Sequence, residues 1–437
     1  MQSTPTRPQK PPIFYGWVVV AGLSVGLGFI MVLATSNFSL FVKPMAEELG
    51  IGQSPFGLSF TFRLLAVAMV GPFIGRTLDR YGTRVPFAVA GAVGGTVVLM
   101  LAFVSNAWQM IALFTLLGMT GFWGSSSLYP TVAVAKWFVR KRAKAMSFVF
   151  AGTPIGMAIS LVSTQWLISE FGWRVAWGVL GGVSAVALVL VPLLIVRNQP
   201  SDMGLEPDGD SPEAPVTSGA DAANPVAPRA AAEHPWTRAE AMRTGAFWRI
   251  AVCYGLIMFT MSSFSIFRAP YFLSKGISGN FVAFGLATDA MMQLAVTLVL
   301  ASLMVRFQPR FLGALAFAIE AVALVIAMFT TEAWHMFVAN ILAGLGIGTL
   351  MLMQTVIWPT YFGRANIGAI RGLATPVSLV FSAAGATMTG FVFDATGSYN
   401  IAWSVAAAGL VIGAIVLGLT PKPLPKKAQT TTASPAV

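Results

Sequence analysis

Apolar stretches long enough to cross a lipid bilayer recur along the whole chain, and they limit what it can fold into. A membrane-spanning helix needs about 20 mostly apolar residues. Continuous apolar runs argue against a β-barrel, whose strands alternate in polarity. We therefore expect twelve spans, at 16–40, 55–75, 84–104, 109–131, 145–168, 174–196, 247–270, 281–304, 311–330, 337–359, 369–392 and 400–420.

The composition supports an all-α integral membrane protein. Of 437 residues, 56% are hydrophobic and 10% are charged, whereas an average soluble domain is about 25% charged. Cys253 is the one cysteine, which excludes a disulfide framework, and two histidines leave little for a metal site. We expect no cofactor. Because the sequence lacks a phosphate-binding Gly-x-x-x-x-Gly-Lys-Ser/Thr fingerprint, ATP drive is unsupported.

The net charge of +11 reflects an uneven distribution of cations across the membrane. With both termini in the cytoplasm, 22 of the 27 cations fall on the cytoplasmic side and Arg63 falls inside a span. Such an excess of internal cations orients membrane proteins, so we expect a multi-pass protein of the cell inner membrane and no nucleic-acid partner. The four external cations are Lys43, Arg174, Arg268 and Lys275.

Residues 197–246 break the apolar pattern. They are rich in Pro, Ala, Ser and Gly, which predicts a disordered cytoplasmic linker. It separates a six-helix bundle at 1–196, with a cytoplasmic tail, from a second bundle and tail at 247–437. The polar leader at 1–12 predicts no cleavable signal before the first span.

The two bundles look like copies. One constant shift along the chain, which we call the repeat offset, aligns 107–110 (AWQM) with 333–336 (AWHM) and 176–179 (AWGV) with 402–405 (AWSV). An offset of an even number of spans leaves the copies parallel, an architecture in which substrate binds near the membrane midplane between the halves.

The loop between the second and third spans carries Gly75, Asp79, Arg80, Gly82 and Arg84. This segment resembles the Gly-x-Leu-x-Asp-Arg-x-Gly-x-Arg motif of the major facilitator superfamily. The resemblance implies a twelve-helix transporter in which the glycines permit a tight turn. Asp79 would cap the next helix or pair with cations of a neighbouring bundle as a latch.

Shorter segments resemble one branch of that superfamily. The run 136–145, KWFVRKRAKA, looks like the entry to span 5 in monocarboxylate transporters and their bacterial relatives, which include oxalate–formate-type exchangers. The segments 171–174 (FGWR) and 393–399 (FDATGSY) also suit this branch. The resemblance implies an organic-anion substrate.

Three charged residues are candidates for positions near the bilayer centre within predicted spans: Arg63, Asp289 and Glu320. A charge near the bilayer centre is costly unless it faces a cavity or a partner. The repeat offset also relates Arg63 to Asp289, so the two occupy equivalent positions at one depth. Arg63 would anchor a substrate carboxylate, and Asp289 would couple transport to protons or contact the substrate. The alternatives are that Arg63 reaches the outer interface, or that both charges neutralise local partners.

Span 8 departs from the monocarboxylate pattern, in which an Asp is followed one turn later by an Arg. Asp289 fits the first position, but Gln293 occupies the second. Either Arg63 replaces that Arg from the other half or the substrate is not a simple monocarboxylate. We expect Gln293 to contact substrate, Arg268 to be a cation of the outer vestibule, and Glu320 to be a protonated or locally paired structural residue.

Further candidates for lining the cavity are polar or aromatic residues near mid-depth, although each could serve in packing alone. They are Trp123, Ser126, Thr260, Ser263 and Thr349.

These features predict a monomeric secondary transporter of a small organic anion, coupled to protons or a counter-anion. One alternative keeps the fold and carries a heterocyclic nutrient such as a vitamin, an aromatic compound or an exported drug. Another is a membrane receptor or enzyme, which would need a catalytic polar cluster or a large external domain.

Overall fold

A computed structural model describes residues 14–33, 35–122, 128–209, 236–303, 308–363 and 366–423. Within these ranges the regular elements are helical, and nine helices are long and apolar enough to cross a membrane. Some crossings consist of shorter helices that follow each other, and α7 contains two crossings in one helix. Counted in this way, the structure agrees with the twelve spans of the predicted fold class.

The first six crossings form one bundle. α7 supplies two of them because its backbone turns at Gly172, which has φ 80°, a left-handed conformation that glycine adopts at little cost. In chain order the elements are α1 (Tyr15–Ile30), η1 (Met31–Leu33), α2 (Thr35–Leu49), α3 (Ser54–Tyr81), α4 (Arg84–Met100), η2 (Leu101–Phe103), α5 (Ala107–Met119), α6 (Leu128–Trp137) and α7 (Arg142–Leu194).

The second bundle repeats this plan. α5 and α12 begin at Ala107 and Ala333, two residues that the repeat offset aligns, in agreement with the predicted duplication. Its helices are α9 (Gly245–Ser274), α10 (Gly279–Leu303), α11 (Pro309–Met328), α12 (Ala333–Phe362), α13 (Ile367–Thr396) and α14 (Asn400–Gly418).

The ends of the predicted linker are ordered, contrary to the expectation of disorder throughout. They form η4 (Pro200–Met203), η5 (Pro207–Gly209) and α8 (Arg238–Met242). The carboxylate of Asp208 accepts hydrogen bonds from the backbone N–H groups of Val139, Arg140 and Lys141, just before α7 begins. A carboxylate is stabilised at such a helix start by the unpaired amides. Residues 210–235 lie outside the described residues.

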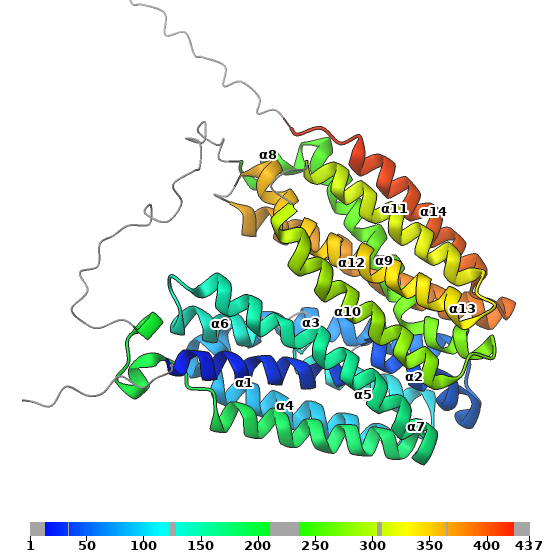
Figure 1. The fold of residues 1–437 in the computed structure, drawn as a ribbon, viewed down its shortest axis with the longest axis horizontal. Coiled ribbons are helices and arrows are strands. Elements are labelled where there is room, and N and C mark those ends of the chain that lie inside the picture. Colours follow the sequence, from blue (N-terminus) through cyan, green and yellow to red (C-terminus); the bar gives the residue numbers. More distant parts are fainter. Residues whose placement is uncertain are drawn as a thin grey trace, which may run out of the picture.

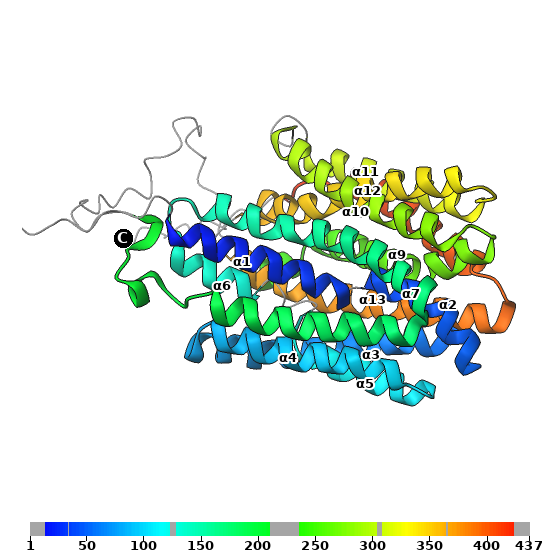
Figure 2. The ribbon, with the colours of Figure 1, turned by 60° about the horizontal axis from the view of Figure 1, so that its bottom comes forward.

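We call the end of the molecule that carries Tyr81 and Leu194 the linker end, and the opposite end, with Leu49 and Ser274, the far end. The two bundles lie side by side and approach each other toward the far end, where α2 and α13 lie, and are set apart near α6 and α8 (Figure 1). Between the bundles, α13 packs against α3 and α10 against α7, and both pairs can be followed in the rotated view (Figure 2).

Polar contacts between the bundles gather at the far end. Asp394 of α13 accepts hydrogen bonds from the backbone N–H groups of Gln53 and Ser54 at the start of α3, at 2.5 and 2.8 Å. Further along α3, the Thr61 hydroxyl lies 2.7 Å from that of Thr387. Between α2 and α9, the backbone N–H of Ala269 donates to Ser39 Oγ. These contacts join the two bundles at the far end.

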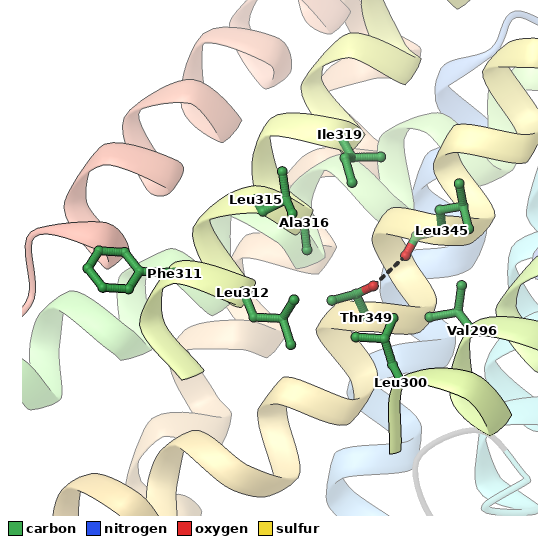
Figure 3. Close-up of a pocket in the computed structure, with 9 residues that line it drawn as sticks. All are labelled: Val296, Leu300, Phe311, Leu312, Leu315, Ala316, Ile319, Leu345 and Thr349. Carbon is green, nitrogen blue, oxygen red and sulfur yellow. Dashed lines mark hydrogen bonds between the residues drawn. The ribbon is translucent and has the colours of Figure 1, made fainter. Parts of the chain in front are cut away.

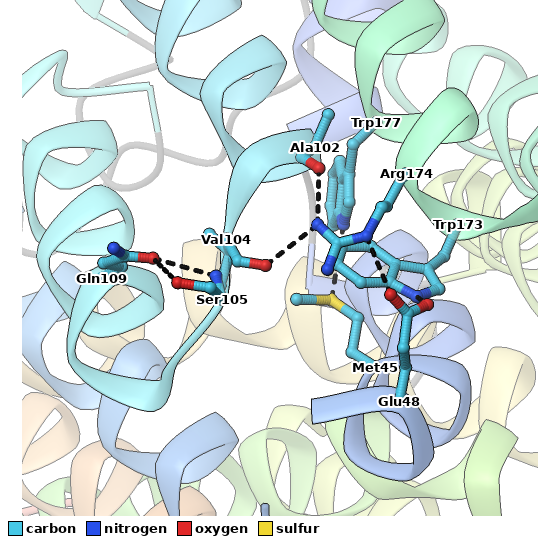
Figure 4. A network of polar contacts seen from close by, with 9 residues as sticks. All are labelled: Met45, Glu48, Ala102, Val104, Ser105, Gln109, Trp173, Arg174 and Trp177. Atoms are coloured by element: carbon cyan, nitrogen blue, oxygen red, sulfur yellow. Dashed lines mark hydrogen bonds and ion pairs between the residues drawn. The ribbon is translucent and has the colours of Figure 1, made fainter. Parts of the chain in front are cut away.

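A second polar network braces the turn in α7 (Figure 4). Glu48 of α2 accepts hydrogen bonds from Trp173 Nε1 at 2.5 Å and Arg174 Nε at 2.8 Å. The Arg174 guanidinium also donates to the carbonyl oxygens of Ala102 and Val104. One arginine therefore ties together α2, η2 and the second arm of α7.

We predict that this brace weakens in acid. Hydrogen bonds from Arg174 and then Trp173 hold the pKa of Glu48 below its ordinary value of 4.5. A lowered pKa contributes stability above the ordinary pKa, and that contribution disappears as the pH falls through the lowered value. The melting temperature of Glu48→Gln should therefore lie below that of the wild type at neutral pH and approach it in acid. Glu47→Gln is the matched control, and an equal deficit at every pH would contradict the prediction.

We also predict that Asp394→Ala loosens the far end. Each charge-assisted hydrogen bond lost there is worth about 2 kcal/mol, so conformations with a more open far end become more populated. Spin labels at Glu170 and Thr331, in a Cys253→Ser background, report the distance between the bundles by electron–electron double resonance. Asp394→Asn, which keeps an acceptor, should shift the distribution less. Identical distributions in all variants would contradict the role of Asp394.

Candidate functional site

A buried ion pair lies inside the second bundle. Arg268 Nη1 of α9 lies 2.7 Å from Asp289 Oδ2 of α10, and each side chain is 1% exposed. The Arg268 guanidinium also lies over the Phe264 ring. Burying two charges is tolerated when they pair closely and their remaining groups find hydrogen bonds.

Two amide side chains complete the network. Gln293 Nε2, one turn along α10, donates to Asp289 Oδ1 at 3.0 Å. Asn340 of α12 accepts from Arg268 Nη1 at 3.1 Å and donates to the Met336 carbonyl oxygen. Arg268 Nε is buried and has no hydrogen-bond partner among the described residues. A guanidinium has five N–H donors, so Arg268 keeps donor capacity for a further acceptor.

Glycines set the distance between the helices that carry these groups. A Cβ at Gly344 of α12 would overlap the carbonyl oxygen of Asp289, and a Cβ at Gly118 of α5 would overlap that of Arg63. The repeat offset relates Gly118 to Gly344, just as it relates Arg63 to Asp289. Both halves therefore use a glycine contact to seat one charged residue at the same place in the repeat, because small residues allow close helix contact.

Arg63 lies in α3 and is 3% exposed, so it does not extend to the outer interface. It is not among the partners of Asp289, whose contacts are Arg268 and Gln293. Of the proposed ligands, the structure thus brings together Asp289 and Gln293.

The sequence led to a wrong position for Arg268 and gave no prediction for Asn340. The position expected for Arg268, in the outer vestibule, is wrong because the side chain is buried in α9. The predicted span at 247–270 already contains Arg268, and that placement was the signal for a buried charge. Asn340, a polar residue within the predicted span at 337–359, carried a similar signal.

The small polar candidates bond within their own bundle. The Thr260 hydroxyl donates to the Leu256 carbonyl oxygen, and the Ser263 hydroxyl lies 2.6 Å from that of Thr389 in α13. These contacts match the packing alternative, while a role in binding stays a prediction. Trp123 and Ser126 lie outside the residues whose side chains are described.

Thr349 lines a pocket of about 410 Å³ between α10, α11 and α12, and none of the lining residues is charged (Figure 3). Its hydroxyl donates to the Leu345 carbonyl oxygen, and the other lining residues are apolar. Phe311 and Leu315 at its edge are more than half exposed. The pocket therefore offers apolar contact only and opens on the outer surface of the bundle.

The loop motif is more helical than expected, since Gly75, Asp79 and Arg80 lie within α3. The tight turn is at Gly82, with φ 73°. Asp79 is exposed and makes no hydrogen bond or ion pair with a described residue; its latch role stays a prediction. Arg84 donates instead to the Leu193 carbonyl oxygen at the end of α7.

Comparison with protein families gives a match over residues 25–288 to the Major Facilitator Superfamily model. The chain belongs to this superfamily. The superfamily and its relatives make this protein a transporter rather than an enzyme.

The curated relatives of this transporter include monocarboxylate transporter 2 from Mesocricetus auratus. It is 24% identical, over 94% of this chain and 85% of its own length. The Homo sapiens protein of that name is 22% identical, over 94% of this chain and 88% of its own length. These relatives support the predicted branch.

Solved structures share the fold. The nucleoside transporter NupG has a TM-score of 0.67 and 12% identity, covering 91% of this chain and 98% of its own. A bacterial homologue of the human lysosomal transporter Spinster, in an inward-facing and occupied conformation, has a TM-score of 0.66 and 15% identity, covering 92% and 94%.

Proposed function

We propose that this transporter moves a small organic anion of the monocarboxylate class, together with a proton. The observation that carries the proposal is the buried Arg268–Asp289 pair, in which Arg268 keeps a donor without a partner among the described residues. The curated relatives named monocarboxylate transporters support the same substrate class.

The pair suggests how proton and anion are linked. While Asp289 is ionised, it neutralises Arg268. Protonation of Asp289 removes that charge and leaves the guanidinium to bind a carboxylate, which can accept two parallel hydrogen bonds. In either state Arg268 is neutralised, and this lowers the cost of carrying it through the membrane interior.

Arg268 supplies the guanidinium that the monocarboxylate pattern places one turn after the aspartate. Here Gln293 holds that position and binds the aspartate directly. In our proposal Arg268, in the second bundle, binds the substrate carboxylate. Arg63, at the repeat-equivalent position of Asp289, binds the same anion from the first bundle when the bundles close around it. Gln293 and Asn340 would orient the pair.

We further propose rocker-switch alternating access by a monomer, with the linker end in the cytoplasm of a cell with an inner membrane. The 22-to-4 distribution of cations supports this orientation. The far-end contacts of Asp394 and Thr61 would then close the outer side, giving a carrier open toward the cytoplasm. The latch proposed for Asp79 would act in the opposite state.

A neutral heterocyclic substrate is the second candidate. Gln293 and Asn340 place amide groups beside the pair, and amides suit the donor and acceptor edges of a heterocycle. The solved nucleoside transporter has the same fold, although that likeness reports the fold alone.

Exchange for a counter-anion is the alternative coupling mode.

We predict that Asp289→Asn abolishes proton-driven uptake of L-lactate by purified protein in liposomes but leaves lactate–lactate exchange partly intact. The amide cannot gain or lose the coupling proton, whereas exchange needs no net proton movement. Initial rates of radiolabelled uptake with and without a pH gradient measure the effect, and Glu170→Gln at the far end is the control. Wild-type gradient-driven uptake by Asp289→Asn would refute the coupling role.

Both proposed anchors can be tested together. We predict that Arg268→Lys and Arg63→Gln each raise the KM for L-lactate exchange at least about tenfold, the effect of losing about 1.4 kcal/mol of binding. Arg249→Gln, at an exposed position of α9, should leave it unchanged. An unchanged KM in Arg63→Gln alone would remove Arg63 from the site, and an unchanged KM in both would refute carboxylate binding by this pair. A parallel panel with uridine tests the heterocyclic candidate.

A further inference from the structure

A third charged residue of the spans, Glu320, is buried with no hydrogen-bond or ion-pair partner among the residues that the structure describes. It lies in α11 and is 2% exposed, and its Oε2 has no hydrogen-bond partner among the described residues. The sequence suggested a protonated or locally paired structural group, and no described residue forms a local pair with it. A buried polar atom without a partner needs an explanation.

The carboxyl group points toward α12, at a place where that helix has no side chain. A Cβ at Gly346 would lie 2.7 Å from Glu320 Oε2. Gly344 and Gly348, on either side along α12, contact the backbone of Asp289 and Gln293 in α10. Because these three residues are glycines, no side chains of α12 stand at these positions between Glu320 and the ion pair.

Glu320 and Asp289 thus lie against the same short glycine stretch of α12, Glu320 on the side of α11 and Asp289 on the side of α10. The other helices packed against α11 bring no ionisable group to this depth: α14 has none, and those of α12, His335 and Tyr361, lie near its two ends. In α11 itself, Arg310 lies in the first turn. Within the described parts of α11, α12 and α14, no other ionisable group lies at the depth of Glu320, and Asp289 is the one ionisable residue of α10.

Charge balance then constrains the proton count. An unpaired carboxylate in an apolar interior costs several kcal/mol, so the neutral acid is favoured while Asp289 already pairs with Arg268. One guanidinium and two carboxyl groups are neutral together when they share one proton. If Asp289 takes a proton, Arg268 is left without a counter-charge and Glu320 becomes the remaining group that can supply one.

We propose that Glu320 is a second proton site that shares one proton with Asp289. Glu320 releases its proton to water and Asp289 takes one up from water, so negative charge moves from Asp289 to Glu320 while the total charge of the three groups stays constant. When an organic anion then binds Arg268, Glu320 takes a proton from water. The proton sharing stands without the proposed transport function, whereas its role in uptake rests on that function.

Infrared spectroscopy of the purified protein in lipid tests the sharing without any substrate. At neutral pH we expect the wild type to show the carbonyl band of a buried protonated carboxylic acid. Glu320→Gln should lose this band, and Glu170→Gln should keep it. Asp289→Asn should also lose it, because Arg268 then draws the proton off Glu320, and Arg268→Gln combined with Asp289→Asn should restore it.

A band that persists in Glu320→Gln would show that Glu320 is not the protonated acid. A band unchanged in Asp289→Asn would show that Glu320 does not sense the pair, and either result overturns the proposal. Gly346→Ala provides a milder test if Glu320→Gln fails to fold. Its methyl group displaces the carboxyl of Glu320, so the band should shift in frequency, and an unshifted band counts against the geometry.

The transport consequence is measured separately. Glu320→Gln should slow gradient-driven L-lactate uptake about tenfold, equivalent to about 1.4 kcal/mol of barrier, and leave exchange near the wild-type rate. Equal uptake rates would deny Glu320 a part in coupling even if the infrared results hold. Absence of lactate transport by the wild type would instead refute the proposed function and leave the proton sharing standing.

Discussion

A charge held among apolar helices must be neutralised, and the second bundle is arranged around that requirement. Arg268 and Asp289 come from different helices and meet 2.7 Å apart. Gln293 and Asn340 satisfy further lone pairs and donors, and glycines in α12 bring the helices close enough for these contacts. Breaking a buried pair leaves an uncompensated charge, so the charge state of Asp289 bears on every neighbouring group. This dependence is what makes the pair suited to linking a proton with an anion.

The two bundles share one close helix contact at equivalent positions, but the charged residue at that contact differs between them. Gly118 against Arg63 and Gly344 against Asp289 show the same close helix contact at equivalent positions of the repeat. What differs is the partner. Asp289 meets Arg268 of its own bundle, whereas the first-half counterpart of Arg268 is Val42, a buried apolar residue. The two halves thus share the glycine contact, while the Arg268–Asp289 pair has no equivalent at Val42 in the first half.

The sequence was sufficient for the spans, for a tight turn among the motif glycines and for placing Asp289 and Gln293 on one helix face, because these depend on local composition and helical spacing. It was insufficient for the pairing of Arg268 with Asp289, which requires knowing how α9 packs against α10. The order at the ends of the linker was missed for a similar reason. Asp208 is held by backbone amides that lie far earlier in the chain, at the start of α7, and composition carries no information on such a contact.

The placement of the contacts between the bundles has a mechanical consequence. Asp394 and Thr387 contact α3 near its beginning, and the helix runs on for 28 residues in all. At 1.5 Å per residue α3 is a lever about 42 Å long, and a rigid tilt of about 10° around its first turns moves the other end by about 7 Å. A small change in the contacts of Asp394, Thr387 and Thr61 would therefore produce a much larger displacement at the linker end of α3. The contacts that restrain α3 lie near its beginning, and its largest movement would occur at its other end.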